Sequence, residues 1–436
     1  MSIQSLPEGK LNHLQKKIVF TLAFLALYRV GVHIPIPGVD TIALGNFFRD
    51  QGGNLLGMFN MFTGGALSNF SIFALGVMPY ISASIISQLL TVVVPHLEML
   101  SKEGEAGRRK ITQYTRYGTV LLAIIQGYMI SSALETQVFS GRNLVVDPGI
   151  AWKSLSVLTL ASGTAFVMWL GEQITEKGVG NGISLIIFCG IVAGLPQVIG
   201  STYSEYTNQQ IDLFKIIMLS GVCTLIIAGV VFVEQGSRLI PVQYAKRQVG
   251  RKVFGGQASN LPLKVNTAGV IPPIFAGSLL QFPVTAAALS PTSSFAEWIN
   301  LVFIPGQWLY NAVYVSLIVF FAFFYTSIVY KADDIAENLK RHGGYIPGIR
   351  PGARTAEYIH NVLSRLTLVG GVYLAAICVL PTILTGRFNV QFYFGGTSLL
   401  IVVGVALETF RQIDAHRQSL RYDSFLKKGS IRPRGR

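Results

Sequence analysis

The chain has 436 residues, of which 51% are hydrophobic and only 13% charged, and its formal net charge is +14. Soluble globular proteins carry roughly a quarter charged residues, so this composition excludes an ordinary soluble enzyme. Apolar residues gather in long runs such as IVFTLAFLALY from Ile18 and SLIVFFAFFYTSIVY from Ser316. Because a helix needs about 20 mostly apolar residues to cross a bilayer, the sequence predicts a polytopic all-α membrane protein.

Ten candidate membrane spans follow one another along the chain. The first apolar run lacks a small-residue cleavage site and therefore indicates a spanning helix, with no cleavable signal peptide. Several later spans are interrupted by Gly, Ser or Pro, which leaves the count open by one. The predicted spans cover approximately residues 18–34, 70–94, 115–135, 152–173, 182–200, 213–233, 267–289, 307–330, 362–385 and 393–412.

The basic residues of the connections predict the orientation. Most Lys and Arg residues fall in the two terminal tails and in every second connection between them. The positive-inside rule places such segments on the cytoplasmic side, so both termini are expected there, and an even number of spans fits. The connections on the other side hold only Arg49, Arg142, Lys153, Lys215 and Arg387.

A short stretch ahead of the second span, NMFTGGALSNFSIFALG from Asn60 to Gly76, is unusual. It is too polar and too broken by Gly64 and Gly65 to cross a bilayer, yet too apolar for an ordinary surface loop. Two adjacent glycines supply flexible hinge positions. The stretch therefore indicates a segment that packs inside the protein and is only loosely anchored.

An internal repeat links the two halves of the chain. Residues 76–88 read GVMPYISASIISQ and residues 269–281 read GVIPPIFAGSLLQ, with Gly, Val, Pro, Ile, Ala and Gln matched at a constant offset of 193. The first copy opens a helix that enters from outside, and the second opens one that enters from the cytoplasm. This is the pattern of two five-helix halves in inverted topology with a functional path at their interface. The alternative is a chance match between two apolar stretches.

Signals of enzyme chemistry are missing from the sequence. The GVGNG stretch from Gly178 is no phosphate-binding loop, because no Gly-Lys-Ser/Thr follows. The six His residues show no metal-ligand spacing, and Cys189, Cys223 and Cys378 lie in apolar segments that favour packing. We expect no catalytic residue, no metal site and no cofactor.

An ion- or substrate-coupled transporter is the main competing class, because such transporters also contain inverted repeats. They usually need ionisable groups at mid-membrane. Here Arg29 is the main charge inside an early span, whereas Glu172, Glu234 and Glu408 lie near span ends. An intramembrane enzyme is a weaker alternative.

Several long stretches resemble the SecY family, the channel subunits of the bacterial Sec protein translocase, and the resemblance covers nearly the whole chain. It implies two inverted five-helix halves that form a clamshell-like channel. The stretches are GALSNFSIFALGVMPYISASIISQLL from Gly65, KEGEAGRRKITQYTRYGT from Lys102, MWLGEQITEKGVGNGIS from Met168, YAKRQVGRKVFGG from Tyr244, LPLKVNTAGVIPPIFA from Leu261, IPGIRPG from Ile346 and QFYFGGTSLLIVV from Gln391.

The resemblance gives the semi-apolar stretch a role as a plug over about residues 59–70. In the family this segment is a short helix that fills the outer funnel and moves aside when a polypeptide passes. An ordinary re-entrant segment, or a loop that covers the channel, is the alternative. The implied plug residues are Phe59, Met61, Phe62, Gly64, Gly65 and Leu67.

The resemblance also implies a pore ring of branched aliphatic side chains. Such a ring seals by dewetting and forms no sequence-specific hydrogen bonds, which suits a pore for any unfolded chain. Isoleucine at helical spacing alone more often faces lipid or packs between helices, so only the repeat and the resemblance support this assignment. The implied ring residues are Ile81, Ile85, Ile183, Ile187, Ile274 and Ile401.

The helices that carry the two repeat copies are expected to form a lateral gate through which apolar segments reach lipid. Gln88, Asn181 and Gln281 are the polar residues assigned to it. Hydrogen bonds between membrane helices are weak, about 0.6 kcal/mol each, as a gate that must open requires. Packing between helices is an equally good interpretation of Gln88.

The basic loops at about residues 234–266 and 331–361 are too long to be mere connectors. The resemblance implies that they dock the SecA motor ATPase and the ribosome, with basic side chains on rRNA phosphates. The residues assigned to docking are Arg247, Arg251, Lys252 and Arg350. Topology alone also explains Arg251 and Lys252, whereas Pro347, Gly348, Pro351 and Gly352 hold Arg350 in place.

The sequence thus predicts a protein-conducting channel of the bacterial cytoplasmic (inner) membrane. Residues 1–200 form the amino-terminal half with the first five spans and the plug, and residues 201–436 form the carboxy-terminal half with both docking loops and a basic tail. The resemblance implies SecE and SecG as further subunits and signal sequences, unfolded preproteins and membrane lipid as partners. Energy would come from SecA, the ribosome or the proton motive force.

Overall fold

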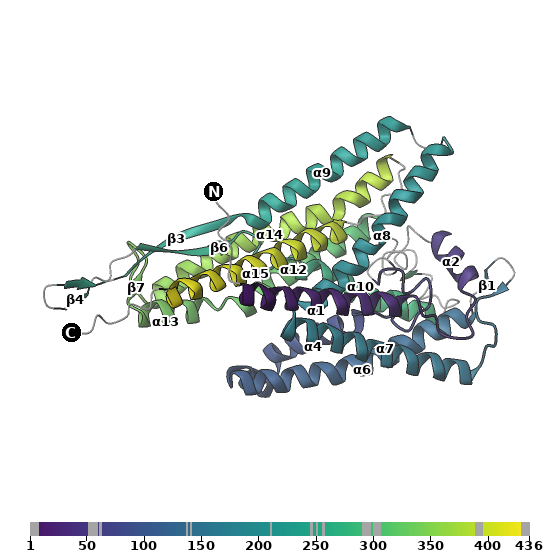
Figure 1. Cartoon of the computed structure of the whole chain (residues 1–436), viewed down its shortest axis with the longest axis horizontal. Coiled ribbons are helices and arrows are strands. Elements are labelled where there is room, and N and C mark those ends of the chain that lie inside the picture. The colour runs from purple at the N-terminus through teal and green to yellow at the C-terminus, as the bar shows by residue number, and fades with distance from the viewer. Residues whose placement is uncertain are drawn as a thin grey trace. The chain divides into compact units, whose positions relative to one another are not determined.

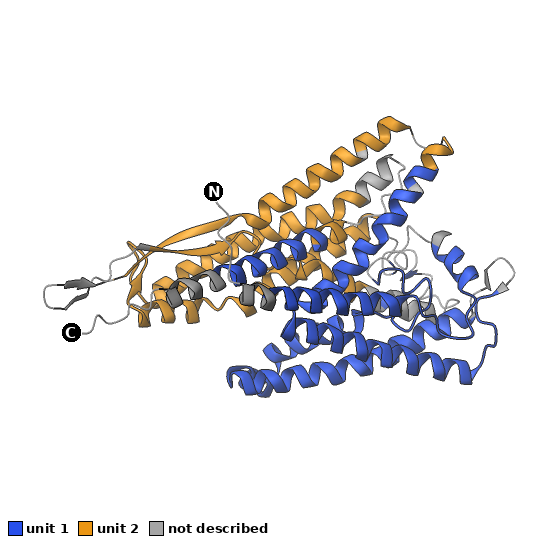
Figure 2. Cartoon of the chain, viewed as in Figure 1, with its two compact units in different colours: residues 1–204, 281–301, 401–436 blue, residues 205–280, 302–400 orange. Residues whose placement is uncertain are grey.

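A computed structural model describes residues 8–50, 60, 63–136, 138–139, 142–209, 212–244, 247–249, 252–254, 258–289, 298–299, 307–388 and 396–428. Two compact units make up the chain (Figure 2). Unit 1 contains residues 1–204, 281–301 and 401–436, and unit 2 contains residues 205–280 and 302–400. The predicted division at residue 200 into two sequence halves stays a prediction.

Unit 1 is built from long helices (Figure 1). Helices α4, α6 and α7 pack against one another, and α1 packs against α7. A two-stranded ribbon, β1 (Val138–Phe139) with β2 (Arg142–Asn143), connects α6 to α7. The helices that begin in this unit are α1 (Glu8–Val32), α2 (Thr41–Asp50), α4 (Met78–Val93), α5 (Pro95–Lys102), α6 (Glu105–Thr136), α7 (Ile150–Lys177) and α8 (Gly182–Thr207).

Unit 2 combines helices with a small sheet. Its helices are α9 (Leu213–Gln235), the first part of α10 (Ile271–Leu289), α12 (Trp308–Val329), α13 (Ala332–Arg341) and α14 (Ala353–Phe388). Helix α15 (Gly396–Lys428) begins in unit 2 and continues in unit 1 from Ile401.

Each predicted membrane span contains a helix. Among the described residues, α6, α7, α8, α9, α12, α14 and α15 are long and apolar enough to cross a membrane, and the pair α4–α5 makes an eighth such element. Helices α1 and α10 lie in the two remaining predicted spans. The all-helical polytopic class is therefore confirmed.

The boundaries of the second span differ from the prediction. Helix α4 begins at Met78, because residues 70–77 form turns, and the chain bends by 99° between α4 and α5. Pro95 opens α5, and the residue before a proline avoids the helical region. Val94 accordingly has φ −97° and ψ 113°, which ends α4.

The two basic loops fold together rather than separately. Strand β3 (Ser237–Tyr244) pairs antiparallel with both β6 (Ala258–Lys264) and β7 (Gly344–Tyr345). We call β3, β6, β7, α13 and the first turns of α14 the loop subdomain (Figure 1). Its apolar core consists of Ile240, Leu263, Ile346, Ile359, Val362 and Leu363.

A second hairpin, β4 (Arg247–Val249) with β5 (Lys252–Phe254), extends the connection between β3 and β6. The predicted docking loops are thus a folded surface with its own core. The pattern of Lys and Arg does not predict this core.

Candidate functional site

The first residues of the semi-apolar stretch that the structure describes contact the last turns of helix α1. The hydroxyl of Tyr28 donates a hydrogen bond to the carbonyl oxygen of Thr63 at 3.2 Å, and Nη1 of Arg29 donates to the carbonyl oxygen of Gly64 at 2.5 Å. Tyr28 and Thr63 are buried, with 1% and 4% of their surface exposed. Two neighbouring side chains of α1 therefore hold two neighbouring backbone carbonyls.

Gly64 is a packed position and Gly65 is an open one. Gly64 has φ +68°, and a Cβ added there would lie 2.7 Å from the Cα of Gly190 in α8. Gly65 has φ +86°, and its nearest neighbour would be the Ser68 hydroxyl at 3.8 Å. The two glycines look equivalent in the sequence, yet only Gly65 has space for a side chain.

The remaining plug residues are described in part. Leu67 is buried, and residues 63–69 form turns. Phe59, Met61 and Phe62 lie outside the described residues, as does most of the amino-terminal part of the predicted plug helix.

The end of the same stretch is fixed by backbone pairing and aromatic packing. The N–H of Ile36 donates to the carbonyl oxygen of Phe70 at 3.0 Å, and the N–H of Ile72 donates to that of Ile34 at 3.1 Å. The ring of Phe73 stacks on Tyr28 and on Phe166 of α7, with centroid distances of 5.8 and 5.9 Å.

Helix α7 approaches this part of the chain at a glycine. A Cβ added at Gly163 would lie 1.8 Å from the carbonyl oxygen of Ile72, so no larger residue fits without a backbone shift. Residues 70–73 are thus held by α1, by the chain after α1, and by α7.

The two repeat copies begin their helices in the same way. Gly76 has φ +53° and Gly269 has φ +65°, a region that glycine enters at little cost. Two residues later the helices α4 and α10 begin, at Met78 and Ile271, which are 193 positions apart. Proline follows at the second helical position in both, where a missing N–H costs no helical hydrogen bond. The repeat is therefore a repeat of backbone conformation as well as of sequence.

The predicted ring residues lie on four helices. Ile81 and Ile85 of α4, Ile187 of α8 and Ile401 of α15 are buried, and Ile183 of α8 is partly buried. Ile183 packs on α7, since a Cβ at Gly171 would lie 2.8 Å from its Cγ1, and this contact favours a packing role. Ile274 is partly buried in α10 of unit 2. The ring itself stays a prediction.

Two of the predicted gate residues bond within their own segments. Nε2 of Gln88 lies 3.5 Å from the Ser84 hydroxyl, one helical turn away. Oδ1 of Asn181 accepts hydrogen bonds from the backbone N–H groups of Ile183 at 3.1 Å and Ser184 at 3.4 Å, which caps the start of α8. Gln281 belongs to α10, and its side chain lies outside the described part of the structure. A role of the three residues in gating stays a prediction.

The GVGNG stretch is a junction that sequence reasoning missed. The N–H of Val179 donates to the Thr21 hydroxyl of α1 at 3.1 Å, and the N–H of Gly180 donates to Oε1 of Gln412 in α15 at 2.9 Å. A Cβ at Gly178 would lie 2.4 Å from the Thr21 hydroxyl oxygen. The dense glycines are the one sequence signal of this close approach.

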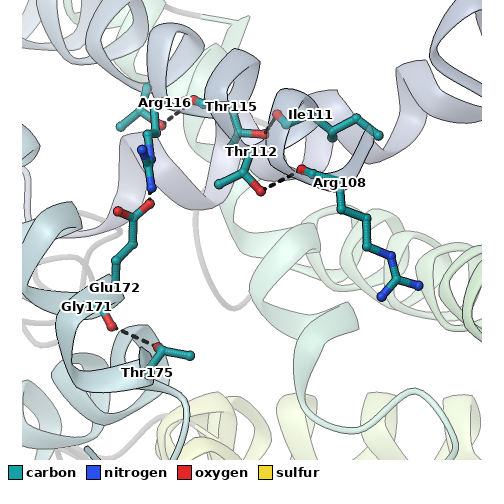
Figure 3. A network of polar contacts seen from close by, with 9 residues as sticks. Arg108, Ile111, Thr112, Thr115, Arg116, Gly171, Glu172 and Thr175 are labelled. Atoms are coloured by element: carbon teal, nitrogen blue, oxygen red, sulfur yellow. Dashed lines mark hydrogen bonds and ion pairs between the residues drawn. The ribbon is translucent and has the colours of Figure 1, made fainter. Parts of the chain in front are cut away.

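Ionisable groups near the membrane helices bond to protein partners. Arg116 of α6 forms an ion pair with Glu172 of α7 at 2.8 Å, close to the hydroxyls of Thr112, Thr115 and Thr175 that bond to helix carbonyls (Figure 3). Oε1 of Glu234 accepts from Nδ2 of Asn266 at 2.5 Å in unit 2. The first pair joins two helices, and the second joins α9 to the connection before α10, as structural charges do.

Arg350 lies on an exposed, ordered turn of unit 2 between β7 and α14. Gly348 and Gly352 adopt φ +81° and +111°, and the carbonyl oxygen of Arg350 accepts a hydrogen bond from the Thr355 hydroxyl at 3.1 Å. Arg247 and Lys252 lie in strands β4 and β5, and Arg251 lies outside the described residues. The fold thus presents Arg350 to solvent on a turn whose backbone is fixed.

The long apolar helices and the repeated helix start define a polytopic membrane protein. Residues 71–410 match the SecY family. The protein translocase subunit SecY of Escherichia coli K12 is 49% identical over 432 residues, which are 98% of this chain and 97% of that protein. The SecY subunit of Pseudomonas aeruginosa is also 49% identical and covers 100% of this chain and 98% of its own length. The chain belongs to the SecY family of protein translocase channel subunits.

Solved structures share the fold. One, described as a protein-conducting channel, is 16% identical with a TM-score of 0.67 and covers 96% of this chain and 95% of its own. A SecY structure reported with a plug domain that stabilises the closed state is 17% identical, with a TM-score of 0.66 and the same coverage. Sec61 from a canine ribosome–channel complex is 15% identical, with a TM-score of 0.63, 96% coverage of this chain and 95% of its own. The predicted all-helical, SecY-type polytopic fold is confirmed.

Proposed function

We propose that this chain conducts unfolded preproteins across the bacterial cytoplasmic membrane and releases apolar segments sideways into lipid. The observation that carries the proposal is the pair of helix starts at Gly76 and Gly269, in a chain that belongs to the SecY family. Two helices with the same start in opposite halves supply the two sides of a gate that can part. The chain itself has no catalytic role, and energy comes from its partners.

The direct test is reconstitution of the chain, together with whatever subunits copurify, into proteoliposomes. A preprotein with a signal sequence and a motor ATPase should give protease-protected preprotein, and small solutes should not be taken up against a gradient. Solute accumulation without preprotein protection would support a secondary transporter instead.

The plug over about residues 59–70 closes the resting pore. Support comes from the buried, hydrogen-bonded seat of Thr63 and Gly64, and from the related channel whose plug maintains a membrane seal. Deleting residues 59–69 should leave transport working while raising the resting ion conductance in planar bilayers. A resting leak equal to that of the parent chain would contradict this assignment.

The isoleucine ring is tested by crosslinking. Cysteines placed at positions 85, 187 and 274 should each form an adduct with a stalled preprotein, whereas a cysteine at the lipid-exposed Phe232 of α9 should not. Replacing the three isoleucines together by asparagine should raise ion permeability during transport, because polar side chains hydrate a constriction that otherwise dewets. Failure of all three positions to crosslink would remove the ring.

The loop subdomain and the adjoining Arg350 turn dock partners on the cytoplasmic side, where both termini also lie. The partners are the SecA motor and the ribosome, with SecE and SecG as further subunits. A guanidinium on a fixed turn can make two-pronged contacts with a carboxylate or a phosphate, which a lysine cannot reproduce. The ordered, exposed turn at Arg350 supports this role.

Arg350→Glu should therefore abolish motor-driven import into inverted vesicles, and Arg350→Lys should impair it. Chain abundance should stay near the parent level, because an exposed turn residue contributes little to the membrane fold. Arg109→Glu is the matched control, since Arg109 is an exposed arginine of helix α6, outside the loop subdomain, and should leave import near the parent level. Normal import by the Arg350→Glu vesicles would contradict the docking role.

A further inference from the structure

Arg29 is a charged side chain in the last turn of helix α1, which ends at Val32, and it lies inside the first predicted membrane span. Among the described residues it forms no ion pair with a carboxylate. Its Nη1 instead donates to the backbone carbonyl of Gly64 at 2.5 Å. A cation inside a membrane helix is costly and usually serves a function.

The hydrogen bond between Arg29 and Gly64 depends on both residues. A Cβ at Gly64 would come within 2.9 Å of Nη1 of Arg29 and 2.7 Å of the Cα of Gly190, so only glycine lets the backbone lie between α1 and α8. Tyr28 supports the seat from the preceding position of α1 through its bond to Thr63. Hydrogen bonds from an ionised donor are about twice as strong as neutral ones.

We propose that Arg29 is the positioning residue that holds the plug in its closed seat, through the Gly64 carbonyl, and that this bond breaks when the plug moves. The proposal rests on the assignment of residues 59–70 as a plug. A carbonyl suits a releasable contact, because its loss leaves a neutral acceptor that water can satisfy in an open pore. The guanidinium, likewise, is only partly buried and becomes hydrated when the seat is vacated.

The contacts with Tyr28 and Arg29 hold only one end of the segment, at Thr63 and Gly64. Residues 70–73 are held by backbone bonds to Ile34 and Ile36 and by the Phe73 stacking, and Arg29 contributes to none of these contacts. Loss of the Arg29 bond should therefore expose Thr63 without exposing Ser71, which is also fully buried in the closed chain. A general loss of stability would expose both.

The test measures thiol labelling of the resting channel in nanodiscs, where both faces are open to a water-soluble maleimide. Thr63→Cys and Ser71→Cys are introduced separately into a chain whose Cys189, Cys223 and Cys378 are replaced by alanine. Arg29→Gln should raise the labelling rate at position 63 about tenfold and change the rate at position 71 less than about twofold. Arg116→Gln is the control. It replaces another arginine of the same unit and breaks the ion pair of that arginine with Glu172, and it should change neither rate.

Unchanged labelling at position 63, or an equal rise at both positions, would overturn the proposal. Should Arg29→Gln lower the amount of protein in the membrane, Arg29→Lys is measured instead. It keeps the charge but lacks the reach of the fork, so a rise of about threefold at position 63 is expected, and no rise would overturn the proposal.

The experiments distinguish an error in the proposed role of Arg29 from an error in the plug assignment. Suppose that deletion of residues 59–69 raises the resting conductance while Arg29→Gln leaves labelling and conductance at the parent values. The plug assignment is then supported, and the proposed role of Arg29 is contradicted. If the deletion leaves conductance unchanged, the plug assignment falls, and the labelling at position 63 still shows whether Arg29 holds this segment.

Discussion

The two ends of the semi-apolar segment are held by different kinds of contact. Residues 63 and 64 are held by two side-chain donors of α1, Tyr28 and Arg29, which bond to backbone carbonyls. Residues 70–73 are held by backbone bonds and by aromatic packing on Tyr28 and Phe166. A few polar bonds can be exchanged for bonds to water, whereas buried aromatic surface cannot leave its neighbours without a large cost in free energy.

If the segment acts as the proposed plug, this difference predicts which end moves. The 63–64 end can leave its seat while the 70–73 end remains attached to α1 and α7. Gly65 lies between them, and the nearest atom to a Cβ added there would be the Ser68 hydroxyl oxygen at 3.8 Å, so side-chain packing does not restrict it. We call the contacts of residues 70–73 the permanent attachment and the contacts of residues 63 and 64 the releasable attachment.

The permanent attachment should be the more sensitive to a change of size. Gly163→Val places a branched side chain where even a Cβ would lie 1.8 Å from the carbonyl oxygen of Ile72. Overpacking usually costs 1–3 kcal/mol, and a backbone neighbour that cannot turn aside places this change at about 3 kcal/mol or more. We expect little folded protein in the membrane, measured as monodisperse chain after mild solubilisation.

Gly194→Ala is the matched control for this change, because nothing lies within 4 Å of a Cβ added there in α8. It should leave the yield unchanged. A normal yield of Gly163→Val would show that α7 does not press on residue 72 as described.

The releasable attachment should respond to Gly64→Ala with a leak rather than with loss of the fold. The left-handed conformation costs a non-glycine residue about 1–2 kcal/mol, and the contact with Gly190 adds a steric cost. Gly65→Ala carries the same conformational cost with open space around the new methyl group.

Resting conductance in planar bilayers should therefore rise clearly for Gly64→Ala and much less for Gly65→Ala. Equal conductance of the two variants would mean that the packing against Gly190 plays no part in closure. Preprotein transport should remain in both.

The smallest effect is expected from Tyr28→Phe. This change removes one neutral hydrogen bond to Thr63, worth about 1 kcal/mol, and keeps the ring that stacks on Phe73. Hydrogen exchange of the backbone should speed up at residues 63–65 and stay the same at residues 70–73. Faster exchange over both stretches would show that the two attachments are coupled.

The sequence was sufficient for features that depend on local pattern. Hydropathy located the spans, and the repeated glycine and proline identified the two matching helices, although the predicted spans began at residues 70 and 267 rather than at Met78 and Ile271. The resemblance to the SecY family rests on such stretches, and the family match confirms it.

Features that depend on pairing of distant residues could not be predicted. Gly64 and Gly65 differ only through Gly190 and Arg29, which lie far away in the chain. The loop subdomain forms because strand β7 pairs with strand β3, which precedes it in the chain by about a hundred residues. Neither loop shows a strong alternating pattern that would predict these strands. The sequence pattern also did not indicate that the amide oxygen of Asn181 caps α8, and the gate role of Asn181 stays a prediction.

The central claim is that one end of the plug leaves its seat during transport while the other end stays. It is tested most directly by labelling cysteines at positions 63 and 71, in the cysteine-free chain, with a preprotein stalled in the channel. The account predicts that position 63 changes from protected to reactive and that position 71 stays protected. Protection of both positions, or equal reactivity at both, would contradict it.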